Sequence, residues 1–99
     1  MKKLTDISKL KQGDKFYFIS GIEVNRVYEF ICIHPKSKHY IIALEGMMPV
    51  NLDADRVLHT NKYYVGEYDI MEVNRIRLRE LQEMVKSLSN MLLSEEHSS

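Results

Sequence analysis

Hydrophobic and polar residues alternate along most of the first two thirds of the chain, which is the pattern of half-buried β-strands. Six stretches show this alternation: 15–20, 23–34, 39–45, 48–52, 57–59 and 63–65. The first three end at Gly21, Pro35 and Gly46, residue types that interrupt a strand. We therefore predict about five short, mostly antiparallel strands, with either of the last two stretches supplying the final one. Pro49 predicts an edge position for the fourth strand.

The alternation also predicts which side chains form the core, because successive residues of a strand point to opposite faces. Within 15–20, Phe16 and Phe18 share one face, and Tyr17 and Ile19 share the other. Within 23–34, one face carries two aromatic residues and Cys32. The predicted core combines the faces richest in large apolar residues: Phe16, Phe18, Tyr28, Phe30, Tyr40, Ile42 and Leu44.

Two runs resemble parts of SH3-like barrels. The run Leu-Lys-Gln-Gly-Asp-Lys-Phe-Tyr-Phe at 10–18 resembles their first strand, and Val-Asn-Leu-Asp-Ala-Asp-Arg-Val at 50–57 is similar to their closing 3₁₀ turn. The resemblance is one of fold alone and implies no function. We expect an α+β fold: a small SH3-like five-stranded β-barrel over 14–66, preceded by an N-terminal turn over 1–13 that Thr5 or Asp6 caps, and followed by one long helix.

The periodicity becomes helical near Asp69, which is a good N-cap with Glu72 three residues later. No glycine or proline interrupts the following residues, so we predict a helix over 68–93. Residues 1–93 then form a single domain, and the polar residues 94–99 are expected to be a disordered tail.

The predicted helix is apolar over an arc of about 200°, roughly twice the width that a single packing face needs. Part of the arc can pack on the barrel, and a second copy or another protein can cover the rest. Alternatively, the arc simply wraps more of its own core. We expect a homodimer centred on Leu81, Val85 and Leu88. The residues expected to mediate self-association are Leu81, Val85, Leu88, Leu92, Asn74 and Arg77.

Composition and charge exclude several classes of protein. Of the 99 residues, 44% are hydrophobic and 28% are charged, which is the balance of a globular domain. The net charge is zero, so no bulk electrostatic attraction favours nucleic acid or a membrane. No apolar run approaches the ~18 residues of a membrane span. Cys32 is the only cysteine, and no secretory signal follows the first residues, so we expect a cytoplasmic protein.

No group of residues predicts an enzyme. Cys32 and His34 lie two apart on a predicted strand, but this spacing is more typical of a small core residue beside a strand end. His39 and His59 add no recognisable metal-ligand spacing, and the four glycines fit no phosphate-binding loop. We expect no catalytic residue, no metal and no cofactor.

Two surfaces of the predicted barrel are candidates for binding. Met47 and Met48 follow Gly46 at a hairpin tip, and methionine is common at protein-binding surfaces. The favoured interpretation is therefore a small non-enzymatic binding module of the adaptor or inhibitor type, with an unknown protein partner. Its small size is typical of proteins encoded by a virus or other mobile element.

The second surface gives an alternative interpretation. Basic residues beside aromatic ones are typical of small barrels that bind single-stranded nucleic acid. Five residues fit this pattern: Lys36, Lys38, Lys62, Tyr63 and Tyr64.

Overall fold

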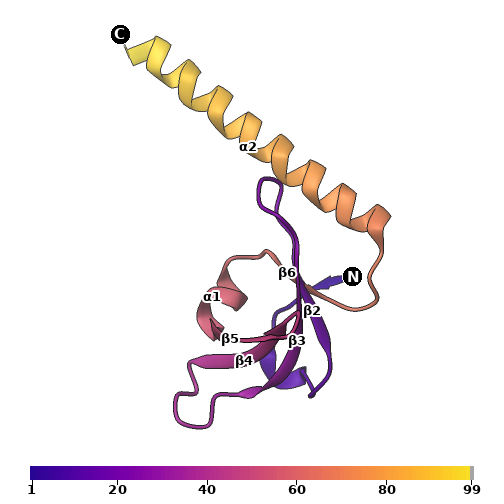
Figure 1. The fold of residues 1–99 in the computed structure, drawn as a ribbon. Helices are drawn as coiled ribbons and strands as arrows, with labels where there is room; N and C mark the ends of the chain where they lie inside the picture. The colour runs from indigo at the N-terminus through magenta and orange to yellow at the C-terminus, as the bar shows by residue number, and fades with distance from the viewer. Residues whose placement is uncertain (99) are drawn as a thin grey trace.

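The computed structural model describes the backbone of residues 1–98 and the side chains of residues 1–94 (Figure 1). It is an α+β fold, as predicted, with one antiparallel sheet of six strands in the order β1-β6-β2-β3-β4-β5. The strands are β1 Lys2–Lys3, β2 Lys15–Phe18, β3 Arg26–Ile33, β4 Tyr40–Glu45, β5 Met48–Asp53 and β6 Tyr63–Val65. The helices are the 3₁₀ turn η1 Ile7–Lys9, α1 Ala54–His59 and α2 Ile70–Ser98.

The sheet is open, so the prediction of a closed, five-stranded barrel is wrong. The hydrogen-bonded order begins at β1 and ends at β5, and no pairing joins these two edges among residues 1–98. The additional strand is β1, in which Lys2 pairs with Val65 and Lys3 with Tyr64. Two lysines carry no hydrophobic alternation, so the pattern could not predict this strand. β5 does lie at an edge, as Pro49 predicts.

Three aspartates begin the helical segments by accepting backbone N–H groups. The Asp6 carboxylate accepts from Ser8 at 3.0 Å, which confirms one of the two predicted caps of the N-terminal turn. The Asp69 carboxylate accepts from the N–H of Met71 at 3.0 Å, so the predicted N-cap of α2 is also confirmed. Asp53 does the same for α1, which occupies the stretch 57–59 that alternation had assigned to a strand.

Hydrophobic clusters cover both faces of the sheet. The first lies on the inner face, beneath η1 and α1, and consists of Leu4, Ile7, Phe16, Tyr28, Phe30, Ile41, Ala43 and Val57. The second lies between the outer face and α2, and consists of Tyr17, Ile19, Tyr64, Val73 and Ile76. The predicted division of 15–20 into two faces is therefore confirmed, because Phe16 belongs to the first cluster and Tyr17 and Ile19 belong to the second.

The predicted orientation of β4 is wrong. Ile41 and Ala43 are fully buried, whereas Tyr40 is exposed and Ile42 and Leu44 are only partly buried. All five residues are apolar or amphipathic, so alternation alone could not decide which set faces inward.

A β-bulge in β3 changes the facing of Cys32. Phe30 pairs with Ala43, but Cys32 pairs with Ile42, so one extra residue lies between the two pairs. Cys32 therefore shares a face with Ile42 and not, as alternation predicts, with Phe30, and it lies outside the inner cluster.

The N-terminal turns of α2 pack on the loop between β2 and β3 as well as on the sheet. A Cβ atom added to Gly21 would lie 3.0 Å from Leu81 Cγ and 3.1 Å from the carbonyl oxygen of Arg77, so a side chain here would push the loop and the helix apart by a few tenths of an ångström. The Arg77 Nε also donates a hydrogen bond to the Ser20 carbonyl oxygen at 3.0 Å. These contacts fix the direction in which α2 leaves the sheet.

α2 begins and ends close to, but not at, the predicted residues. It runs over Ile70–Ser98, whereas 68–93 was predicted. Of the residues 94–99 predicted to form a disordered tail, 94–98 are the last residues of α2, and Ser99 lies outside the described residues.

Candidate functional site

Beyond Leu81, which lies against the β2–β3 loop, α2 extends away from the sheet (Figure 1). Every side chain from 81 to 94 is exposed, whereas Val73 and Ile76, in the first two turns, are buried. The sheet is too short to follow a helix of 29 residues, which is about 43 Å long. The described side chains from 82 to 94 therefore extend beyond the sheet and are exposed.

The exposed part of α2 carries a continuous apolar stripe, which we call the α2 stripe. Its residues recur at heptad spacing and are all exposed: Met71, Leu78, Leu81, Val85, Leu88 and Leu92. At about 100° per residue, the stripe lies on a different side of the helix from Val73 and Ile76. Leu88 and Leu92 are 57% and 62% exposed, which is unusual for leucines that share one face with four other apolar residues.

Five of the six residues predicted to mediate self-association lie together on this side of α2. Leu81, Val85, Leu88 and Leu92 belong to the α2 stripe, and Asn74 is exposed at the heptad position between Met71 and Leu78. The sixth, Arg77, is partly buried against the β2–β3 loop instead, where it donates the hydrogen bond to Ser20 described above.

Three apolar residues of α2 that could have packed on the sheet are exposed: Ile70, Met84 and Met91. Met84 and Met91 lie beyond the last turn that contacts the sheet, on the flank of the α2 stripe nearer the sheet-facing side. The apolar surface of the helix is therefore wider than the stripe alone.

The β2–β3 loop adds two exposed apolar residues, which sequence reasoning missed. Ile22 and Val24 are 62% and 81% exposed, and both lie in the loop that Gly21 brings against α2. Alternation had assigned Val24 to the start of a strand, but β3 begins only at Arg26. The available signal was two apolar residues around Glu23, directly after a glycine.

Two ion pairs attach the start of α2 to the sheet. The Lys62 ammonium lies 3.0 Å from the Glu80 carboxylate, and the N-terminal amino group of Met1 lies 3.0 Å from Glu72. Burial alone would raise the pKa of Glu80, but hydrogen bonds from Lys62, Gly21 and Ser20, together with the Lys62 charge, lower it below its ordinary value. Glu72 contacts the N-terminal amino group of the chain. Its spacing from the N-cap residue Asp69 predicted a role at the start of the helix and not this contact.

The structure does not bring together the five residues predicted to bind nucleic acid. Lys36 and Lys38 lie in the β3–β4 loop, and Lys62 is engaged in the ion pair described above. Tyr63 and Tyr64 are neighbours on β6 and so point to opposite faces. Tyr63 packs against the inner cluster, whereas Tyr64 is buried in the cluster beneath α2.

His34 has a structural role in a turn, whereas the two hairpin methionines are exposed. The His34 Nδ1 atom accepts the backbone N–H groups of Lys36 at 3.1 Å and Ser37 at 3.0 Å, so this histidine stabilises the β3–β4 turn. Met47 is almost fully exposed at the β4–β5 turn, and Met48 is exposed at the start of β5. Both methionines are free to contact a partner.

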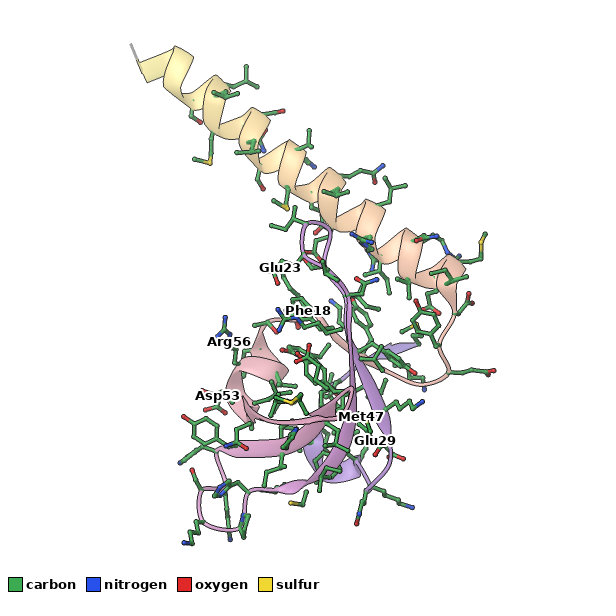
Figure 2. All side chains as sticks on the ribbon, in the orientation of Figure 1. Phe18, Glu23, Glu29, Met47, Asp53 and Arg56 are labelled. Carbon is green, nitrogen blue, oxygen red and sulfur yellow. The ribbon has the colours of Figure 1, made fainter. Side chains whose placement is uncertain are left out.

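A cavity of about 540 Å³ opens on the inner face, between α1 and the start of β3. Figure 2 labels four of its residues, Phe18, Glu23, Asp53 and Arg56, which lie on the α1 side of the sheet. Its lining combines aromatic rings with charged groups: Phe18, Glu23, Arg26, Tyr28, Tyr40, Asn51, Leu52, Asp53, Arg56, Val57, Thr60, Lys62 and Tyr63. Sequence reasoning could not find it, because five strands, α1 and two loops supply these residues.

Comparison with known proteins gave no match to a protein-family model, a curated protein or a solved structure. Within the described residues, no helix combines the length and apolar character needed to cross a membrane. Among the same residues, no three histidine, cysteine, aspartate or glutamate side chains gather closely enough to hold a metal ion.

Proposed function

We propose that the protein is a small non-enzymatic protein-binding module that self-associates through α2, with the α2 stripe of one copy packing on that of a second. The observation that carries this proposal is the exposure of the whole stripe, from Met71 to Leu92, in the isolated chain. Such a stripe at heptad spacing is the seam along which two helices pack. An adaptor or inhibitor needs only a surface for self-association and a second surface that binds its partner.

The stripe is large enough to support association. Burying one leucine-sized side chain completely contributes roughly 1.5–3 kcal/mol, and these side chains are a little more than half exposed, so each contributes about 1 kcal/mol. A two-fold pair buries six such residues from each copy. Their sum is about 12 kcal/mol, and against a cost near the lower end of the ~4–15 kcal/mol range for association it leaves about 8 kcal/mol, which corresponds to a dimer in the micromolar range.

Charge along α2 favours an antiparallel pair. Residues 70–80 contain three arginines and two glutamates, whereas 81–98 contain three glutamates and one lysine. Antiparallel packing brings the basic half of each helix beside the acidic half of the other and opposes the two helix dipoles. It also places the flanks that carry Met84 and Met91 against each other, whereas parallel packing would place them against Ser89 and Glu96.

Cysteine cross-linking tests this orientation. In a Cys32→Ser background, an antiparallel pair centred near residue 83 brings the two copies of Gln82→Cys together, so a short bismaleimide should link them. The same pair separates the two copies of Leu92→Cys by ~27 Å along the helix axes, because each residue rises about 1.5 Å. Efficient linking of Leu92→Cys but not of Gln82→Cys would show a parallel pair. Linking of neither, together with a monomeric mass, would refute self-association itself.

The SH3-like part of the fold is also a proposal. What supports it is that β2, β3, β4 and β5 form a consecutive antiparallel meander, and that α1 then returns the chain so that β6 pairs with the free side of β2. The inner cluster fills the concave side of this arrangement, as in a small barrel. We also propose a cytoplasmic location, because the single cysteine, Cys32, has no partner for a disulfide within the chain.

A further inference from the structure

We infer that the cavity beside α1 binds a single carboxylate, supplied by an acidic residue of a protein partner, with an adjacent apolar side chain against the tyrosine rings. The inference extends the proposed protein-binding role and names the chemistry of the partner. It does not depend on self-association, because the cavity and the α2 stripe share no residue. The volume of about 540 Å³ is within the range of sites that hold small organic groups.

The wall of the cavity is aromatic. The ring centre of Tyr63 lies 5.3 Å from that of Phe18 and 6.2 Å from that of Tyr28. Tyr40, at the start of β4, contributes a fourth ring and is partly exposed. Packed rings of this kind present flat apolar surfaces to a ligand side chain and hold their hydroxyl groups in fixed positions.

Three cations line the cavity, and they differ in how fully other groups engage them. Lys62 is held by Glu80 at 3.0 Å, and Arg26 lies 3.9 Å from Glu45. Arg56 makes no ion pair among the described side chains and lies at the α1 side of the cavity (Figure 2). A guanidinium without an internal partner can bind both oxygens of an incoming carboxylate.

The hydroxyl of Tyr63 is suited to donate to the same carboxylate. Burial raises the pKa of Tyr63 above its ordinary value, and the nearby Tyr28 adds to this, while Arg56 and Arg26 act in the opposite direction. The phenol therefore stays protonated near neutral pH and is available as a hydrogen-bond donor. Arg56 and Tyr63 both line the cavity.

The charge of the lining favours a single anionic group over a polyanion. The three cations are accompanied by Glu23 and Asp53, so the lining carries a net charge of about +1. A nucleic acid would bring several phosphates against these two carboxylates. A peptide with one acidic residue beside an apolar one matches both the charge and the aromatic wall.

A titration followed by NMR tests the inference on the ¹⁵N-labelled full chain. The probe is the blocked dipeptide acetyl-Glu-Phe-amide, and its matched control is acetyl-Gln-Phe-amide. We expect the Glu peptide to shift the amide signals of Tyr63 and Arg56, and the Gln peptide to bind at least about tenfold more weakly, because it cannot form the charged hydrogen bonds. Equal binding of both peptides, or shifts confined to other parts of the sheet, would overturn the inference.

Two variants separate the role of Arg56 from a general charge effect. Arg56→Gln should weaken binding of the Glu peptide by at least about tenfold. Arg56→Lys should weaken its binding less, because lysine keeps the charge but not the paired hydrogen bonds. Lys38→Gln, which removes a charge in the β3–β4 loop, should leave binding unchanged. Unchanged binding by Arg56→Gln with a native spectrum would refute the assignment.

Two further titrations distinguish a peptide site from a nucleic-acid site and from a site for small acids. A single-stranded oligothymidylate that shifts the cavity signals more strongly than the Glu peptide would show a nucleic-acid site and refute the inference. Benzoate binding as tightly as the peptide would show a site for small acids and refute the assignment to a protein partner. The monomeric Leu88→Glu variant should bind the Glu peptide as the wild type does, so failure of self-association leaves this result unaffected.

Discussion

Replacing Leu88 with glutamate should convert the dimer into a folded monomer. Leu88 is 57% exposed in the isolated chain, so the change costs little in the monomer, where exposed substitutions shift stability by about 0.5 kcal/mol or less. In the dimer, each copy loses about 1 kcal/mol of apolar burial and gains a desolvated carboxylate that costs roughly 1–3 kcal/mol or more. Two copies together lose at least about 4 kcal/mol, which weakens association about a thousandfold.

The assay combines light scattering with circular dichroism. Leu88→Glu should have the mass of one chain at concentrations where the wild type is dimeric, and its thermal transition should show an intact sheet. Asn90→Glu is the matched control, since it adds the same charge at an exposed position on the side of the helix opposite the α2 stripe. The reasoning is refuted if Leu88→Glu remains dimeric, or if Asn90→Glu dissociates the dimer to the same degree.

Three further predictions concern the attachment of α2 and the core. Gly21→Ala should destabilise the protein by roughly 1–3 kcal/mol in chemical denaturation, because its Cβ meets the α2 backbone; wild-type stability would show that the loop yields. Glu80 has a pKa held below its ordinary value, so it stabilises the fold above about pH 4.5, and this contribution disappears as the pH falls through the lowered pKa. Melting temperatures of the wild type and Glu80→Gln should therefore converge on acidification, and a constant difference would contradict this. Phe30→Ala should cost about 3–5 kcal/mol, since Phe30 is buried on the inner face; an unchanged melting temperature would place it outside the core.

Local signals in the sequence predicted the features that depend on neighbouring residues. Asp6 and Asp69 cap their helical segments because a carboxylate before a helix accepts free N–H groups, whatever the tertiary structure. Phe16 and Tyr17 lie on opposite faces because strand geometry alone separates them. The α2 stripe was predictable for the same reason, since heptad spacing is a property of the helix itself.

Features that depend on distant parts of the chain were not predictable. The facing of β4 depends on the bulge between Phe30 and Cys32, and no residue type marks that bulge in the sequence. β1 forms because β6 leaves an edge free for Lys2 and Lys3 to pair with. The cavity joins Phe18 to Arg56 through the curvature of the sheet, and the approach of Gly21 to α2 depends on where the helix leaves the sheet.

The mass of the wild-type chain in solution tests the central claim most directly. Light scattering over a range of micromolar concentrations should give twice the chain mass of 11.7 kDa, falling toward a single chain only on dilution. A mass of 11.7 kDa at every concentration would contradict the account, because the α2 stripe would then remain exposed without a second copy to cover it.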